Sequence, residues 1–390
     1  MNKHWLRLWG AVVGLCWSVN AAAATLLVQP GDSLVQVLSR AADGDTVHIA
    51  PGDHRGQVAV IEHKRLTLRG LPSAAGARPV LHAQGRHAEG KAILVVRNGD
   101  VLIENIEFRG ARVPDGNGAG IRFERGRLVV SRCAFFDNQN GLLTGNQTDA
   151  ELRIEDSEFG AAPAGSQLPH LLYVGRIARF SLSGSRLSGG RSAHLVKSRA
   201  RENHIHGNQL VDGEGGSAAY ELEFPNGGLA WVVGNVIAQS ADTSNSAIVS
   251  FGAEGAVDDR EQGLFLAHNT LVNHALRPAV FVRMHNLERP VEHRFVNNLM
   301  VGLGLAMGTG TLELTDLTRG NFTLPVSALP GVERGDYALA ADSWLRGRGV
   351  PPGSARGVSL MLPSTGPAPS IGTRAGTDAQ QRWSPGAQPH

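Results

Sequence analysis

Ile205-His-Gly-Asn-Gln-Leu210 and Leu266-Ala-His-Asn-Thr-Leu271 are two copies of one short unit, an apolar residue, a bend of small or polar residues, and a second apolar residue. Each unit joins two short β stretches at a tight bend, where Asn or Gly tolerates the required backbone. The other copies begin at residues 103, 130, 154, 182, 233 and 295, and successive copies are about 23 to 34 residues apart. No unit could bury its apolar face alone, so we expect the units to stack as coils of an all-β solenoid.

A second periodicity concerns polar residues in the middle of the chain. Tyr173, Lys197 and Glu221 are 24 residues apart (197−173 and 221−197). In coils of that length, residues one period apart lie above one another. They belong to the stretches 170–175, 194–200 and 220–228, which we therefore expect to form a ladder of polar side chains on one wall.

Strand alternation predicts which side chains leave the coil, because successive residues face opposite sides. Leu222 in the core leaves Glu221 and Glu223 outside, and the same argument exposes Tyr173 and Lys197. Further candidates for the same wall are His170, His194, Arg199, Asn226, Phe281 and Arg283. Lys64, Lys91 and Lys197 are the only lysines after residue 3. A lysine kept here supplies a tunable amine that arginine cannot.

The ends of the chain differ from the repeats. Lys3 and Arg7 precede an apolar stretch at residues 8–17 and four alanines at 21–24, the pattern of a cleaved export signal. No later apolar run is long enough to span a membrane. We expect a signal peptide (1–24), a solenoid domain (25–350) and a Pro/Gly-rich, partly disordered tail (351–390). The protein is then secreted or periplasmic.

One segment has helical periodicity. Residues 34–42 place Leu34, Val37, Leu38 and Ala41 on one face. A short amphipathic helix there would cap the open N-terminal end of the solenoid and hide its strand edges.

Two stretches resemble a known family. Pro30-Gly-Asp-Ser-Leu with the following residues to Asp53, then Leu66-Thr-Leu-Arg-Gly70, is similar to the entry of pectate-lyase-like right-handed parallel β-helices. His268-Asn-Thr-Leu-Val-Asn273 is similar to a coil of bacterial members. The resemblance covers roughly residues 26 to 325. It implies a right-handed parallel β-helix of the carbohydrate-active type, with polysaccharide as its partner, and this scaffold hosts several activities.

Composition excludes other classes. The net charge of +2 comes without a basic stripe, so we expect no nucleic-acid partner. Cys133 is the single cysteine after residue 24, which excludes an intramolecular disulfide and favours a small buried residue. We expect a monomer.

β-Elimination on a uronic acid fits the predicted wall. The sugar carboxylate must be neutralised, a base must remove the C5 proton, and a donor must protonate the leaving oxygen. Arg199 or Arg283 could neutralise, Lys197 could be the base, and Tyr173 or His170 the donor. Glu221 and Glu223 could instead hold Ca²⁺, which takes oxygen ligands. The arrangement resembles in kind that of alginate-lyase and chondroitinase-B-type β-helix enzymes.

Four alternatives stay open. An epimerase would use the same first half-reaction and return the proton from the opposite face. Glu221 and Glu223 could be the paired carboxylates of an inverting hydrolase. A non-catalytic β-helix could bind polysaccharide on aromatic platforms such as Tyr173, Trp231 and Phe281. The ladder could also consist of structural ion pairs, worth under about 1 kcal/mol each when exposed.

Overall fold

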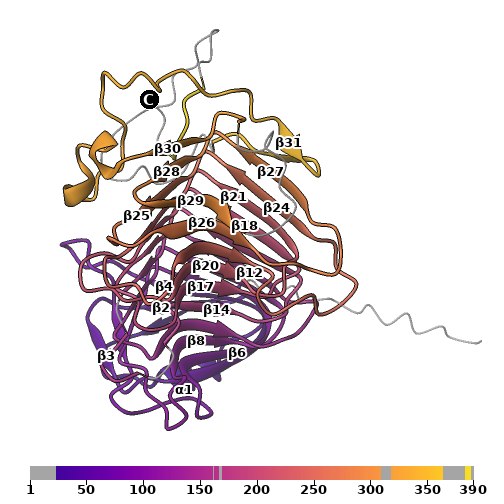
Figure 1. The fold of residues 1–390 in the computed structure, drawn as a ribbon. Helices are drawn as coiled ribbons and strands as arrows, with labels where there is room; N and C mark the ends of the chain where they lie inside the picture. Colours follow the sequence, from indigo (N-terminus) through magenta and orange to yellow (C-terminus); the bar gives the residue numbers. More distant parts are fainter. Residues whose placement is uncertain (1–22, 161, 167–168, 309–317, 363–382, 388–390) are drawn as a thin grey trace, which may run out of the picture.

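The computed structural model describes residues 23–160, 162–166, 169–308, 318–362 and 383–387. Its strands stack as a parallel solenoid in which each coil between the two ends contributes one strand to each of three ladders (Figure 1). The expected export signal falls almost entirely on residues 1–22, outside the described residues. None of the helices in the described segments is long and apolar enough to cross a membrane.

Ladder one carries the predicted polar wall. Its strands are β4 (Ala59–Gly70), β6 (Ala92–Glu104), β8 (Ala119–Phe123), β11 (Asn140–Thr144), β14 (Leu172–Val174), β17 (His194–Ser198), β20 (Tyr220–Phe224), β23 (Ala247–Phe251), β26 (Ala279–Met284) and β29 (Gly304–Gly308).

Ladder two follows ladder one within each coil, and the long strands β4 and β6 run through both. Its other strands are β1 (Thr25–Val28), β2 (Thr46–Ile49), β9 (Arg127–Ser131), β12 (Glu151–Glu155), β15 (Arg179–Ser183), β18 (Glu202–His206), β21 (Leu229–Val233), β24 (Gly263–Ala267) and β27 (Glu292–Val296).

Ladder three closes the coil. Its strands are β3 (Asp53–Arg55), β5 (Val80–His82), β7 (Glu107–Arg109), β10 (Ala134–Phe136), β13 (Glu158–Phe159), β16 (Arg186–Leu187), β19 (Gln209–Val211), β22 (Val236–Gln239), β25 (Thr270–Asn273), β28 (Leu299–Val301) and β30 (Phe322–Leu324).

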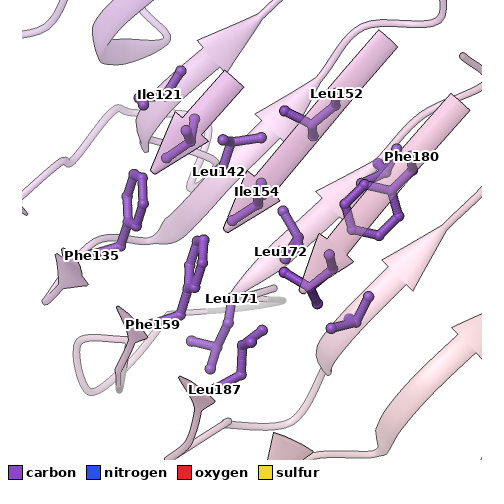
Figure 2. Close-up of a cluster of buried hydrophobic side chains, with 14 of the residues drawn as sticks. Ile121, Phe135, Leu142, Leu152, Ile154, Phe159, Leu171, Leu172, Phe180 and Leu187 are labelled. Atoms are coloured by element: carbon purple, nitrogen blue, oxygen red, sulfur yellow. The ribbon is translucent and has the colours of Figure 1, made fainter. Parts of the chain in front are cut away.

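Apolar side chains from all three ladders fill the interior. Phe135 and Phe159 of ladder three stack in adjacent coils with ring centroids 4.5 Å apart. Figure 2 shows them facing Leu142 and Leu172 of ladder one and Leu152 of ladder two. This continuous core is what a single coil could not form, so stacking supplies the stability.

The recurring sequence unit marks the bend from ladder two into ladder three. A residue with positive φ, such as Gly207 (φ 64°), precedes an inward side chain in each coil. In five successive coils the Oδ1 atom of that side chain accepts the backbone N–H of the preceding coil at 2.9–3.0 Å. Its Nδ2 atom donates to a backbone carbonyl. This Asn ladder consists of Asn208, Asn235, Asn269, Asn298 and Asn321.

Cys133 lies in the same column, three coils before Asn208. It is fully buried, as predicted, and burial raises the pKa of its thiol to about 12. Its backbone N–H donates to the Ser157 hydroxyl at 3.1 Å, so hydroxyl side chains begin the pattern that the asparagines continue.

The predicted capping helix is present as α1 (Leu34–Leu38), shorter than the predicted residues 34–42. Ser33 is its N-cap and accepts the Gln36 N–H at 3.4 Å. Leu34, Val37 and Leu38 are buried, and α1 lies at the N-terminal end of the solenoid (Figure 1).

The described residues after 318 pack on the outside of the later coils. They include the short helices η1 (Val326–Ala328) and η2 (Val332–Arg334) and the strands β31 (Ser354–Ala355) and β32 (Val358–Ser359). Leu339 and Leu345 lie against ladder three, whereas Ala355 and Leu360 cover ladder two.

Trp231 donates its indole N–H to Ala355 O at 3.1 Å and is only 3% exposed. The prediction of Trp231 as an open sugar platform is therefore wrong, because a distant segment covers the ring.

Candidate functional site

The outward-facing column of ladder one contains the predicted row of polar side chains, except that its carboxylate lies two residues later in the sequence than predicted. Tyr173 pairs with Lys197, and Lys197 pairs with Glu223 rather than with Glu221. The coil between Lys197 and its partner has 26 residues (223−197) instead of 24. A fixed period therefore selected the wrong carboxylate. The labels β14, β17 and β20 in Figure 1 mark the three coils.

Glu221 and Phe281 were both predicted to face outward, and both predictions are wrong. The two side chains are 0% exposed. Strand pairing in this region joins His194 to Tyr220 and Val196 to Leu222 but skips the position between them. This irregularity marks the bend into ladder one, where two successive side chains turn inward. The column of Glu221 otherwise consists of Leu171, Leu195, Ile248 and Phe281, all in the core.

Glu221 is consequently a carboxyl group within an apolar interior. Neither of its carboxyl oxygens has a hydrogen-bond partner among the described residues. Burial, and next the nearby Asp212, raise its pKa well above the ordinary value, so the group is neutral near pH 7. A side chain in this position cannot contact a polymer on the outer wall.

Glu223 instead lies at the centre of a group of contacting polar side chains on the outer wall, the outer cluster. Its members are His170, Tyr173, His194, Lys197, Arg199, Glu223 and Glu254. The Oε2 atom of Glu223 is 3.1 Å from Lys197 Nζ and 2.8 Å from His194 Nε2. Burial alone would raise the pKa of Glu223, but the contacts with His194 and Lys197 outweigh burial and lower it. Glu223 is thus a buried carboxylate whose charge is balanced by its neighbours.

Two histidines form a chain of contacts that begins at Glu223: His194 contacts Glu223, and His170 contacts His194. The Nδ1 atoms of His194 and His170 lie 3.2 Å apart. If the Glu223 carboxylate accepts the Nε2–H of a neutral His194, then His194 Nδ1 accepts the Nδ1–H of His170. Burial, followed by His194, Lys197 and Arg199, lowers the pKa of His170 to about 3. With His194 in this tautomer, His170 is a neutral imidazole that carries its proton on Nδ1 and has its Nε2 lone pair available.

Arg199 organises the other side of the cluster. It donates from Nε to the Tyr173 hydroxyl at 2.8 Å and from Nη1 to Asn226 Oδ1 at 2.6 Å. Its guanidinium also holds both oxygens of Glu254, at 2.6 and 2.9 Å. Lys197 Nζ contacts the same Glu254 carboxylate at 3.0 Å. Two cations thus converge on one carboxylate.

Glu254 was not predicted. It projects from the turn Gly252-Ala-Glu-Gly255 after β23, whose two glycines have φ of 85° and 77°. The Arg199 hydrogen bonds, against burial and together with Lys197, lower its pKa to about 2. An acidic residue between two turn glycines is the only sequence signal, and the position of that turn beside Lys197 depends on the fold.

Two further aromatic rings border the cluster, and one predicted cation does not join it. Tyr220 stacks on His194 with ring centroids 5.2 Å apart. His285 lies close enough to Glu223 to sense its charge, although burial and Arg283 lower its pKa. Arg283 itself donates to Ser246 Oγ at 3.1 Å, two coils beyond Glu223 in the same column.

The residues present do not fit the calcium site that Glu221 and Glu223 were predicted to form. Glu221 points into the core and Glu223 to the outer face, so the two cannot share a cation. Glu223 and Glu254 both contact Lys197, and no group of three His, Cys, Asp or Glu in the described segments could hold a metal ion.

Comparisons with known proteins address the fold. No family model matches the chain, and no curated protein matches it. Among solved structures, the crystal structure of pectate lyase Pel9A superposes with a TM-score of 0.57 at 10% sequence identity, over 87% of this chain and 94% of that one. At such low identity the likeness concerns architecture. The chain has the pectate-lyase-like right-handed parallel β-helix fold.

Proposed function

We propose that this protein is an exported, monomeric β-helix enzyme that cleaves an acidic, uronic-acid-containing polysaccharide by β-elimination. One observation carries the proposal: a pair of cations that binds a carboxylate lies against a neutral imidazole and a phenol. These are the three kinds of group that elimination next to a carboxylate requires. Lys197 and Arg199 are the cations, His170 is the imidazole and Tyr173 is the phenol, and all four lie on one wall.

Carboxylate neutralisation is the task of Arg199 and Lys197. Both already bind the Glu254 carboxylate, whose side chain is 44% exposed. A substrate carboxylate that replaced Glu254 would meet the same two cations. Their charge would stabilise the electron density that develops on that carboxylate when C5 loses its proton.

His170 suits the role of base better than Lys197, to which the sequence assigned it. The Lys197 amine contacts two carboxylates and serves as their charge partner. His170 is neutral, with Nδ1 directed at His194, so Nε2 can accept the C5 proton. Glu223 acts through His194 as a positioning residue that fixes this tautomer.

Tyr173 suits the role of proton donor. Its hydroxyl oxygen accepts a hydrogen bond from Arg199, so the hydroxyl proton is free to point at substrate. As C5–H breaks toward His170, the C4–C5 double bond forms and the C4–O bond breaks. The Tyr173 proton passes to the leaving oxygen, and Arg199 stabilises the phenolate until water reprotonates it.

The alternatives lack comparable support. A hydrolase built on Glu221 and Glu223 needs both carboxyls outside, and Glu221 is inside. A binding module built on Trp231 and Phe281 needs open rings, and both are buried. Of the three aromatic rings predicted to stack on sugars, only Tyr173 is not buried.

The test is incubation of the mature protein with uronic-acid polymers while ultraviolet absorbance is followed. Rising absorbance marks the unsaturated sugar that elimination makes, and we expect the rate to be unchanged by EDTA. New reducing ends without absorbance would replace elimination by hydrolysis. Absence of both signals across the panel would leave polymer binding as the better account.

A further inference from the structure

The two groups proposed as base and acid touch each other. His170 and Tyr173 are three residues apart in one coil, and their ring centroids lie 5.1 Å apart at an interplanar angle of 40°. A sugar ring placed between them would need about 7 Å, twice the ~3.5 Å contact distance of carbon atoms. The two side chains therefore address a substrate from the same side.

Neither ring is free to open such a gap. His170 is held against His194, with ring centroids 4.9 Å apart, and His194 is itself stacked on Tyr220. Tyr173 is held by the Arg199 hydrogen bond, and the Arg199 guanidinium carbon lies 5.8 Å from the Tyr173 ring centroid. Contacts on both sides thus preserve the juxtaposition.

This geometry selects among uronic acids by stereochemistry. Removal of the C5 proton and protonation of the C4 oxygen from one side require both bonds on the same face of the ring. The C5–H and C4–O bonds are cis in mannuronate and glucuronate. They are trans in galacturonate and guluronate, which differ from the first two by inversion at C4 or C5.

We infer that the substrate is a polymer of uronic acids with cis C5–H and C4–O bonds, of the manno or gluco configuration, cleaved by syn elimination between His170 and Tyr173. The inference rests on the proposed function and narrows its substrate class.

The test compares polymannuronate and polyglucuronate with polyguluronate and polygalacturonate of matched chain length, by the initial rate of absorbance increase. We expect at least a 10-fold preference for one of the cis polymers. A faster reaction with either trans polymer would overturn the stereochemical inference and keep the lyase. No absorbance with any of the four polymers would overturn both.

A second measurement separates the two roles. In D₂O, the Tyr173→Phe variant keeps the base but loses the donor, so we expect deuterium at C5 of polymannuronate or polyglucuronate with retained configuration and little cleavage. Arg186→Gln, on ladder three where Arg186 bonds Gln209, is the matched control and should cleave normally. Full cleavage by Tyr173→Phe would show that Tyr173 is not the donor and overturn the inference.

Discussion

The Asn ladder and the outer cluster of ladder one are both rows of polar side chains, yet they are built in opposite ways. Along the Asn ladder the same residue makes the same two kinds of hydrogen bond in every coil, between 2.8 and 3.0 Å. In the outer cluster, Tyr173, Lys197 and Glu223 occupy one column and no two are alike. Repetition indicates a structural role, and departure from repetition indicates chemistry.

The largest effect should come from the outer cluster and concern rate alone. His170→Asn removes the proposed base, and we expect kcat to fall about 1,000-fold, within the range for loss of general base catalysis. The unfolding midpoint should change little, because His170 is not part of the core. Steady-state kinetics and thermal unfolding measure both quantities. His204→Asn, on ladder two, is the control. A variant that lost stability and rate together would give His170 a structural role.

Substitution in the Asn ladder should have the opposite effect, a loss of stability without a loss of catalytic rate in the folded protein. Asn269→Ala strips the Asn235 N–H and side-chain amide of their acceptor and Val232 O of a donor. Buried groups left unpaired cost about 1–3 kcal/mol each, so we expect a loss of about 3 kcal/mol in the free energy of unfolding. Urea unfolding measures it, with exposed Asn117→Ala as control. Unchanged stability, or lost turnover in folded protein, would contradict the comparison.

The repeated region is the part that the sequence could predict. Each coil carries its own bend signal, so eight imperfect copies were enough to identify a solenoid of stacked coils, whereas its right-handed parallel form was implied by the family resemblance. The burial of Cys133 in a strand was also predicted, and the side chain is 0% exposed. The capping helix followed from Leu34, Val37 and Leu38 in the same way. These features depend on local chemistry that every coil repeats.

The candidate site was only partly predictable because it depends on where coils differ. Two extra residues before β20 moved the partner of Lys197 from Glu221 to Glu223. A bend that turns two successive side chains inward buried Glu221, which strand alternation cannot anticipate. Glu254 comes from a turn 57 residues after Lys197, and such proximity has no local signal.

Glu221 sharpens the comparison, because it is a buried polar side chain that lacks the hydrogen bonds made by every member of the Asn ladder. Glu221→Met removes a carboxyl that has no hydrogen bond, and we expect the free energy of unfolding at pH 7 to rise by about 1–2 kcal/mol. Ile248→Met, in the same column, controls for the change of shape.

The raised pKa of Glu221 also predicts how the free energy of unfolding changes with pH. The folded-state pKa of Glu221 is raised, so folded protein keeps a proton that unfolded protein releases above about pH 4.5. Glu221 therefore contributes progressively less stability to wild type as pH rises through neutrality. Burial lowers the pKa of His170, His206 and His268, which makes the stability of wild type and variant alike rise with pH toward neutrality, so the contribution of Glu221 is read from the difference between the two proteins. Urea unfolding between pH 6 and 8 should show the stability of wild type falling relative to that of Glu221→Met, and a difference that stays constant with pH would mean that Glu221 is ionised when folded.

The smallest expected effect concerns Glu254, the one carboxylate of the cluster that a substrate would have to displace. Glu254→Gln keeps the shape of the side chain and removes its charge from Lys197 and Arg199. Because Glu254 is 44% exposed, the ion pairs are worth only about 0.5–1 kcal/mol, which corresponds to a KM about 2- to 5-fold lower with kcat unchanged. Exposed Glu158→Gln on ladder three is the control. A higher KM would mean that Glu254 holds Arg199 in place for the substrate instead of occupying the position of the substrate carboxylate.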